Sequence, residues 1–428
     1  MAAIVASVIV IGTLALIFTE KLNRTIVALT GAVVMIAAGK IIGFYSDEQA
    51  IELIEFDALA LLLGMMILVS ILEPTGFFQS IAIKAGQLSK GKPWRLMLLL
   101  GIGTALTSLV LNNITTVVLL GPVTILITEM YGLNPIPFLM AQAILSDTSA
   151  IGSSVGDPAS VLVAAASGNT FTDFLTHAMP IVLVAVLVSL LMLRLLFSRD
   201  LSSRVSDVDV VNKLDASAVI MDRTTMNRVL AVLAVAVGLF LLQGPLNLSS
   251  GFIALAAAVG ALFWVQPDIR EVLKRVDWPV LLFFIGLFVV VGGLEVSGAF
   301  DPIIEFMATW GQERPILLGI AIIWVVAFFS ALVDNVPVTI VMISLLHSLA
   351  ATGMDVSALW WAVVFGAGFG GNATSIGSGA NIIIVSLSER TKHPISPAMW
   401  SRTGLPIAFA TCAVASILFA VAYPLLGR

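Results

Sequence analysis

Long apolar runs, separated by short polar segments, fill the chain from end to end. Many of the runs approach the roughly 20 residues that an apolar helix needs to cross a bilayer. A helix suits such a run, because it satisfies its backbone polar groups within the segment. We expect one ordinary span at each uninterrupted run: 3–19, 25–43, 58–72, 178–197, 226–243, 249–266, 279–294 and 404–425.

Four further apolar runs are interrupted by polar residues. Asparagine suits breaks and turns better than the middle of a lipid-facing helix, because its side chain competes for backbone hydrogen bonds. Proline also breaks a helix. We therefore expect interrupted helices at membrane depth. The breaks are Asn112–Asn113 in the run 96–130, residues 149–158 in 138–166, Asp334–Asn335 in 316–351, and residues 372–381 in 358–388.

The second half of the chain repeats the plan of the first. At an offset of 222 residues, Ser108 aligns with Ser330 and Asn113 with Asn335. In the same register Glu73 aligns with Glu295 and Gly64 with Gly286, which is hard to obtain by chance. We divide the chain into a first repeat at 1–197, a linker at 198–225 and a second repeat at 226–428.

Charge indicates that the two repeats are inverted. The segment 77–95 is basic, whereas its equivalent, 299–315, is mostly acidic. By the positive-inside rule they lie on opposite faces, which is the plan of many secondary transporters. The topology closes only if 96–130 and 316–351 are re-entrant hairpins. We predict about ten transmembrane helices, two of them broken, plus two hairpins, with 198–225 cytoplasmic and both termini external.

Composition supports a membrane protein and argues against an enzyme or a metal-binding protein. The chain has 428 residues, 59% hydrophobic and 11% charged, whereas soluble proteins carry about 25% charged residues. The sequence predicts an all-α polytopic membrane protein, in a plasma or inner membrane. A single cysteine, Cys412, excludes an internal disulfide and a cysteine-cluster metal site. No nucleotide motif or nucleophile–base pair occurs, so we expect no enzyme, cofactor, resident metal or nucleic-acid partner. We place the tryptophans in interfacial belts: Trp94, Trp278, Trp360, Trp361 and Trp400.

The breaks supply neutral donors and acceptors, together with the ends of half-helices. Such a lining suits a small oxyanion, a neutral hydroxylated solute or a partly dehydrated cation. No arginine or lysine stands in the breaks. We predict these substrate-binding residues: Asn112, Asn113, Thr115, Ser153, Ser154, Asn335, Asn372, Thr374, Ser378 and Asn381.

Acidic residues inside a membrane are functional candidates by default. Asp157 and Asp334 each stand at a break, and Asp147 lies shortly before one. We predict that these three couple transport to protons or ions. The alternative is that they only cap the N-termini of half-helices.

These motifs resemble the ion transporter superfamily, and within it the arsenite-permease and sodium–proton antiporter branch. Residues 107–117 and 330–337 are similar to its two hairpin motifs, and 151–160 and 372–381 to its broken helices. Asn112 departs from a frequent aspartate, which leaves the site less suited to sodium. The resemblance implies a scaffold and a mobile transport domain that moves as an elevator. It also implies a homodimer and, in some relatives, an ATPase subunit.

The sequence and this resemblance together lead to a function. We expect an arsenite or antimonite efflux permease driven by proton exchange, because hydroxyl and amide groups suit neutral arsenious acid. A Na⁺/H⁺ antiporter is the alternative. A carboxylate carrier ranks third, since no basic residue stands in the breaks to hold a carboxylate.

Overall fold

The computed structural model describes residues 1–19, 21–203, 211, 214–392 and 394–427, and throughout this part the fold is helical. Each predicted ordinary span is a helix, and the ends lie within three residues of the expected ones except at the last span, which begins seven residues earlier than predicted. The bounds are α1 (Ala2–Phe18), α2 (Arg24–Ile42), α4 (Phe56–Leu72), α11 (Met179–Leu196), α13 (Arg223–Leu241), α15 (Ser250–Val265), α17 (Trp278–Val296) and α23 (Pro397–Leu426). The protein is thus a polytopic all-α membrane protein, as predicted.

The four interrupted runs are pairs of helices, and each pair is broken at the predicted polar cluster. The hairpin pairs are α6 (Pro93–Ser108) with α7 (Asn113–Met130) and α19 (Pro315–Val333) with α20 (Asn335–Ala351). The broken helices are α8 (Ile136–Ala150) with α9 (Pro158–Ser167) and α21 (Ser357–Gly371) with α22 (Gly379–Ser388).

Side chains in two of the breaks cap the helix that follows. The Asn112 amide oxygen accepts from the Ile114 N–H at 2.8 Å, which caps α7. Ser378 caps α22 in the same way, by accepting from the Ala380 N–H at 3.2 Å. These caps satisfy orphan donors that would otherwise be costly to bury.

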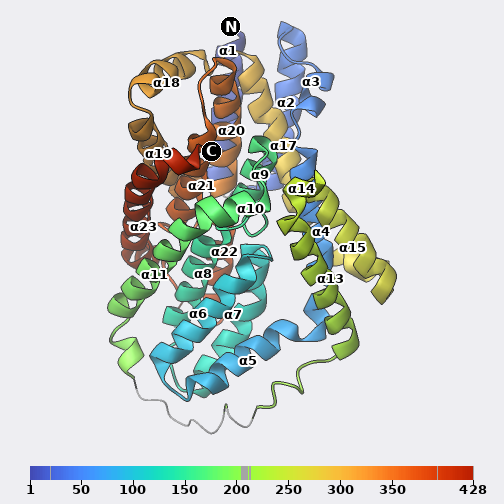
Figure 1. Cartoon of the computed structure of the whole chain (residues 1–428), viewed down its shortest axis with the longest axis vertical. Coiled ribbons are helices and arrows are strands. Elements are labelled where there is room, and N and C mark those ends of the chain that lie inside the picture. Colours follow the sequence, from blue (N-terminus) through green and yellow to red (C-terminus); the bar gives the residue numbers. More distant parts are fainter. Residues whose placement is uncertain (20, 204–210, 212–213, 393, 428) are drawn as a thin grey trace.

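Two amphipathic helices that the hydrophobic pattern did not predict connect the spans to the hairpins. They are α5 (Phe77–Ser89) and α18 (Asp301–Glu313). Figure 1 shows α5 crossing the bottom of the molecule and α18 at the top. They are repeat-equivalent segments at opposite ends, as an inverted repeat requires. Which end faces the cytoplasm stays a prediction.

The remaining helices are short. They are α3 (Asp47–Glu52), η1 (Glu73–Thr75), α10 (Phe171–Asp173), the π-helical turn η2 (Phe174–Ala178), η3 (Asp200–Ser202), α14 (Gln243–Leu246) and α16 (Ile269–Arg275).

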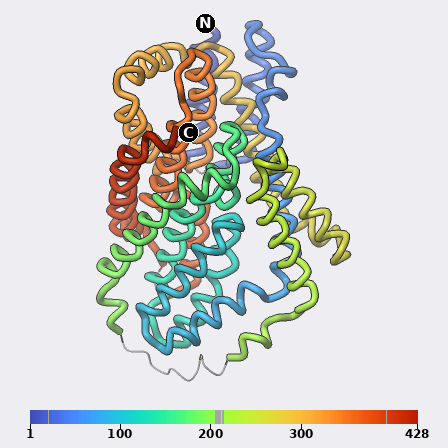
Figure 2. The backbone as a smooth tube through the Cα atoms, viewed as in Figure 1, coloured from blue at the N-terminus to red at the C-terminus, as the bar shows by residue number. Residues whose placement is uncertain are grey.

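The long spans pack in repeat-related pairs, α4 with α15 and α2 with α17, at close glycine contacts. A Cβ on Gly64 would come within 2.5 Å of the Ala254 carbonyl carbon. A Cβ on the equivalent Gly286 would come within 2.8 Å of the Ala28 carbonyl carbon. The hairpins and broken helices form the other packed body, which Figure 2 shows beside these spans. The glycines therefore fix two equivalent crossings on which the rest of the fold is built.

The predicted tryptophan belt is wrong at three positions. Trp360, Trp361 and Trp400 are buried inside the protein. Trp400 packs at the broken helix, where its ring N–H donates to the Asn372 carbonyl at 3.1 Å. A tryptophan can therefore be buried in this protein when its ring N–H has a polar partner in the core, and residue type alone does not indicate that partner.

Candidate functional site

The two hairpin tips meet at one buried carboxylate, that of Asp157. The amide nitrogen of Asn113 lies 3.0 Å from Asp157 Oδ1, and that of Asn335 lies 3.0 Å from the same oxygen. Asp157 Oδ2 accepts from the Ala159 N–H at 2.9 Å and so also caps α9. All three polar side chains are at least 95% buried. The capping alternative is therefore correct for Asp157 but incomplete, because both hairpins also contact it.

A second carboxylate joins this cluster. Asn113 Nδ2 donates to Asp147 Oδ1 at 2.9 Å, so one amide nitrogen bridges Asp147 and Asp157. Asp147 is 3% exposed, and the Ser378 side chain lies next to it. Its other oxygen has no hydrogen-bond partner among the described residues. Repulsion between two buried carboxylates this close favours a single negative charge on the pair.

Four half-helices begin at this cluster, namely α7, α9, α20 and α22. A helix N-terminus carries partial positive charge and unpaired N–H groups. Four of them together favour negative charge, and this explains how the acids are tolerated at depth. The same field favours an anionic ligand near the tips.

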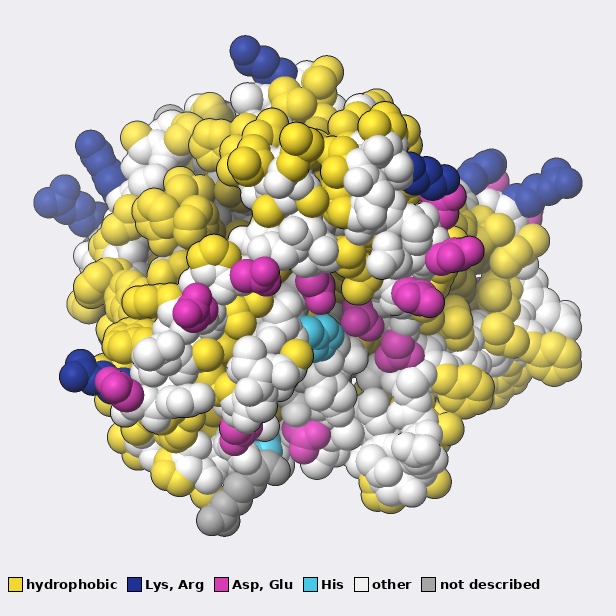
Figure 3. Space-filling model, turned by 90° about the horizontal axis from the view of Figure 1, so that it is seen from above, with side chains coloured by type: hydrophobic (Ala, Val, Ile, Leu, Met, Phe, Trp, Pro, Cys, Tyr) yellow, Lys and Arg dark blue, Asp and Glu magenta, His cyan; other side chains and the backbone are white. Residues whose placement is uncertain are grey.

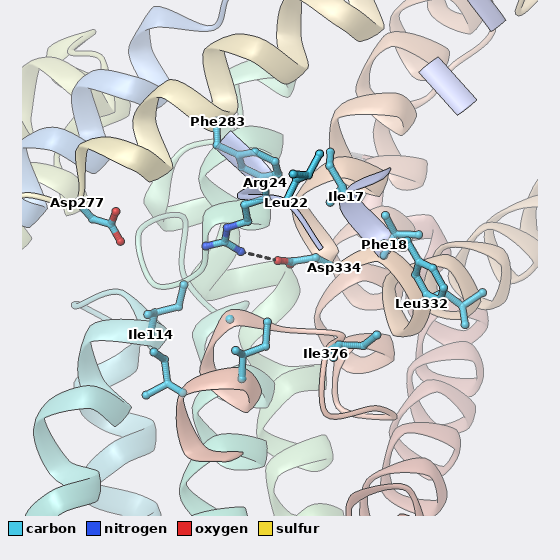
Figure 4. A pocket seen from close by; sticks show the side chains of 14 residues that line it. Ile17, Phe18, Leu22, Arg24, Ile114, Asp277, Phe283, Leu332, Asp334 and Ile376 are labelled. Atoms are coloured by element: carbon cyan, nitrogen blue, oxygen red, sulfur yellow. Dashed lines mark hydrogen bonds and ion pairs between the residues drawn. The ribbon is translucent and has the colours of Figure 1, made fainter. Parts of the chain in front are cut away.

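A basic residue also reaches the tips. Arg24, the first residue of α2, places Nη1 3.3 Å from Asp334 Oδ2, and its guanidinium lies over the Phe283 ring at 5.4 Å from the centroid. Figure 4 shows this ion pair among the side chains that line a pocket. The expectation that no basic side chain stands at the breaks is therefore wrong. Arg24 is 310 positions from its partner, and its local sequence is that of an ordinary helix start.

Arg24 and Asp334 line a cavity of about 330 Å³ between α1, α2 and α17 on one side and the hairpin tips on the other. Ile114 and Gly379, at the starts of α7 and α22, form part of its wall. Figure 4 shows Asp277 on the far side, apart from the ion pair. The remaining lining is largely apolar. The cavity is thus lined by one basic side chain, the N-termini of two helices and largely apolar side chains.

Four of the ten predicted neutral binding groups hold the breaks closed instead of facing this cavity. The Ser153 hydroxyl donates to the Leu109 carbonyl at 2.5 Å, and Thr374 donates to the Ala331 carbonyl at the same distance. These bonds are repeat-equivalent. Asn372 donates to Thr148, and Asn381 donates to the carbonyls of Gly371 and Thr374.

Three more predicted residues have different surroundings. Asn112 and Thr115 line a separate cavity of about 70 Å³ beside α4. The Ser154 hydroxyl is buried without a hydrogen-bond partner among the described residues. The residues brought together at the tips are therefore Asn113, Asn335, Asp147, Asp157 and Ser378, with Asp334 at the cavity.

Residues that the sequence did not single out complete the site. They are Arg24, Phe283, Trp400 and Ser146, whose hydroxyl pairs with that of Ser108 at 2.6 Å. One feature of the sequence could have marked Arg24 as a candidate, namely a charged residue at the start of an apolar span. Nothing local distinguished it from an interfacial anchor.

One end of the molecule is acidic. Figure 3 shows acidic side chains gathered around a histidine on the face seen from above. Among the acidic residues, Glu55 is close enough to Asp57 and His347 to be affected by their charges. Burial raises the pKa of Glu55 above its ordinary value, and His347 opposes the rise.

Paired hairpins, whose tips meet the two buried acids of the broken helix α8–α9, define a membrane transporter built on the inverted-repeat plan. A family described as citrate transporter matches residues 14–366, and the chain belongs to this family. It is therefore a transporter rather than an enzyme.

Several relatives of similar length carry the names of transporters or membrane proteins. An uncharacterized transporter of Mycobacterium tuberculosis is 33% identical over 98% of this chain and 99% of its own. A 46 kDa membrane protein of Mycobacterium leprae is 33% identical with the same coverage. The human P protein is 29% identical over 99% of this chain but only 60% of its own length.

The solved structure of the YdaH transporter of Alcanivorax borkumensis has the same fold. It has a TM-score of 0.60 and 14% identity, and covers 99% of this chain and 98% of its own. It shows the fold alone. The narrower arsenite-permease and sodium–proton branch stays a prediction. The same holds for the particular membrane, the external termini, the homodimer and an ATPase partner.

Proposed function

We propose that the protein is a secondary active transporter of a small carboxylate anion, with citrate as the first substrate to test. The observation that carries the proposal is the Arg24 guanidinium in the 330 Å³ cavity at the hairpin tips. Arginine matches carboxylate geometry with two parallel donors. The helix N-termini at Ile114 and Gly379 add a second attraction for negative charge. The family description, citrate transporter, agrees with this ligand class.

The expected arsenite function ranks second. It rested on free hydroxyl and amide groups, and Ser153, Thr374, Asn372 and Asn381 use theirs to hold the breaks closed. Two neutral hydroxyls without partners among the described residues, Ser154 and Ser160, are the observation in its favour.

A Na⁺/H⁺ exchange function has weaker support. Asp147 Oδ2 is an unpartnered buried acceptor among the described residues, but the adjacent donor amides of Asn113 and Asn335 do not suit a cation. We instead assign Asp147 and Asp157 to proton coupling. A proton entering or leaving this pair changes its charge by one, beside the groups that hold the hairpins together.

We further propose that the hairpins and broken helices move as one body against α1, α2 and α17. The cavity lies at the boundary between these two groups of helices. Movement along that boundary would carry a bound anion past Arg24. This elevator-type movement is the one that the resemblance implied.

Reconstituted proteoliposomes test the proposal. Labelled citrate, arsenite and Na⁺ should be offered separately under an imposed pH gradient, with internal pH followed by a trapped dye. We expect saturable citrate transport that the gradient drives. Arsenite or Na⁺ transport without citrate transport would refute the carboxylate assignment.

One pair of variants links that transport to the cavity. Arg24→Gln removes the guanidinium and its charge but keeps a shorter polar side chain. It should weaken citrate transport by about 30-fold or more, since a charge-assisted pair contributes roughly 2 kcal/mol or more. Arg270→Gln, an exposed position on α16, is the matched control and should transport normally. Equal transport by both variants would remove Arg24 from substrate binding.

A further inference from the structure

The two hairpin tips are repeat-equivalent, yet their backbones differ. Asn112 has φ −52° and caps α7 through the Ile114 N–H. Asp334 occupies the equivalent place before α20, but it has φ +94° and its side chain does not cap that helix. The first tip therefore has an ordinary capped geometry, and the second does not.

The Asp334 geometry is strained. Its φ lies in a region that favours glycine, and another residue stays there only when its surroundings hold it. The contact on the opposite side of the cavity is the ion pair with Arg24, whose guanidinium is itself placed over Phe283. The Asp334 side chain is 13% exposed and that of Arg24 is 37% exposed. The pair therefore remains open to a competing ligand from the cavity.

A second conformation lies close by, because Asn112 adopts it at the other tip. A residue at the N-cap can accept from the second or third N–H of the helix. In α20 the third position is Pro337, which has no N–H, so only the Val336 N–H is left. Val336 is the repeat equivalent of Ile114, which Asn112 caps. A relaxed Asp334 would therefore form the same bond.

We propose that the anion substrate operates the second hairpin tip as a switch. A carboxylate that binds in the cavity pairs with the Arg24 guanidinium and displaces Asp334 from it. Asp334 then relaxes, caps α20 at Val336, and ends the ion pair between the hairpin and α2. The inference rests on the proposed carboxylate function and adds how binding releases the moving body. Asp334 acts as a positioning residue, because it competes with the substrate for the same cation.

The test compares citrate binding by the wild-type protein and two neutral variants in lipid nanodiscs. Asp334→Asn keeps a capping side chain but cannot form the ion pair, so it should bind citrate about tenfold more tightly, a typical size for coupling between sites. Asp277→Asn removes one negative charge from the same cavity and keeps the cap of α17 at Val280. It should tighten citrate binding clearly less than Asp334→Asn does, because Asp277 does not pair with Arg24.

Hydrogen exchange of the 330–340 peptide gives a second reading. Citrate should protect it in the wild type, and Asp334→Asn should show that protection without citrate. If Asp334→Asn fails to fold, Asp334→Gly replaces it, since glycine accepts φ +94° and also frees Arg24.

The outcomes separate the two proposals. Tighter binding by Asp334→Asn alone supports the switch. Unchanged or weaker binding by this variant, with intact wild-type binding, overturns the switch and leaves the carboxylate function standing. Equal tightening by Asp277→Asn also overturns it, because simple charge removal would then suffice. No citrate binding by any form overturns both.

Discussion

Replacing Asn335 tests whether its hydrogen bonds to Asp157 join the two repeats, or whether Asn335 only starts α20. Asn335→Ala removes the amide that donates to both carboxylate oxygens, at 3.0 and 3.3 Å. Asp157 keeps its bonds from Asn113 and Ala159. A hydrogen bond to a charged group contributes roughly 1.5–3 kcal/mol. We expect that loss of stability, seen as a fall in thermal midpoint of about 2–6 °C, together with a transport rate at least about tenfold lower.

A second variant at the same position sharpens the test. Asn335→Asp would replace a donor by a carboxylate about 3 Å from Asp157, a repulsion of about 5 kcal/mol at an effective dielectric constant of 20. If Asn335 only starts α20, aspartate should serve as well or better, because acidic side chains favour helix N-termini. The assay is thermal unfolding in detergent followed by tryptophan fluorescence, with Asn227→Ala, at an exposed position on α13, as a surface control. An Asn335→Asp protein as stable as the wild type would refute the contact.

Three further predictions concern the framework. In a Cys412→Ser background, single cysteines at Lys90 and Glu313 should react with impermeant reagents from opposite sides of the membrane, and labelling from one side would contradict the inverted topology. Cys412→Ser itself should transport normally, since the thiol is buried in α23 away from every break; loss of transport in folded protein would give it a role. Gly64→Ala should lower stability by roughly 1–3 kcal/mol or more, because its Cβ would overlap the α15 backbone; an unchanged unfolding midpoint would show that α4 and α15 can separate freely.

The sequence predicted the breaks well because the signal is local. A polar pair in an apolar run has few acceptable structures, and Asn112 and Ser378 act as the expected caps. The amphipathic helix at 301–313 carried a local signal as well, since Ile303, Ile304 and Met307 recur at helical spacing. The charges of the segment, Asp301, Glu305, Glu313 and Arg314, mask that spacing, because they make the whole segment resemble a polar loop.

The sequence could not predict which distant groups meet. Arg24 and Asp334 are 310 positions apart, and no local pattern encodes their contact. The uses of Ser153 and Thr374 were hidden for a similar reason, because a hydroxyl at a break can bind a solute or a carbonyl. In both repeats the hydroxyl donates to a backbone carbonyl. These long-range contacts favour a carboxylate over arsenite as the proposed substrate, because they bring a basic side chain to the hairpin tips and occupy the hydroxyls of Ser153 and Thr374.

The final prediction concerns the proton. Asp147 and Asp157 share one amide donor, so their charges are tied together at the point where both hairpins meet. Asp157→Asn keeps an acceptor for the Ala159 N–H, and Asp147→Asn keeps one for Asn113, so both variants should fold. Each loses a site for the exchanged proton. We expect citrate–citrate exchange to persist, while uphill uptake driven by a pH gradient falls at least about tenfold, because exchange needs no net proton movement. Asp355→Asn, an acid at an outer loop, should retain both activities. A double variant that still accumulates citrate, with normal proton flux, would place the coupling elsewhere, and Asp334 would then be the acid to examine.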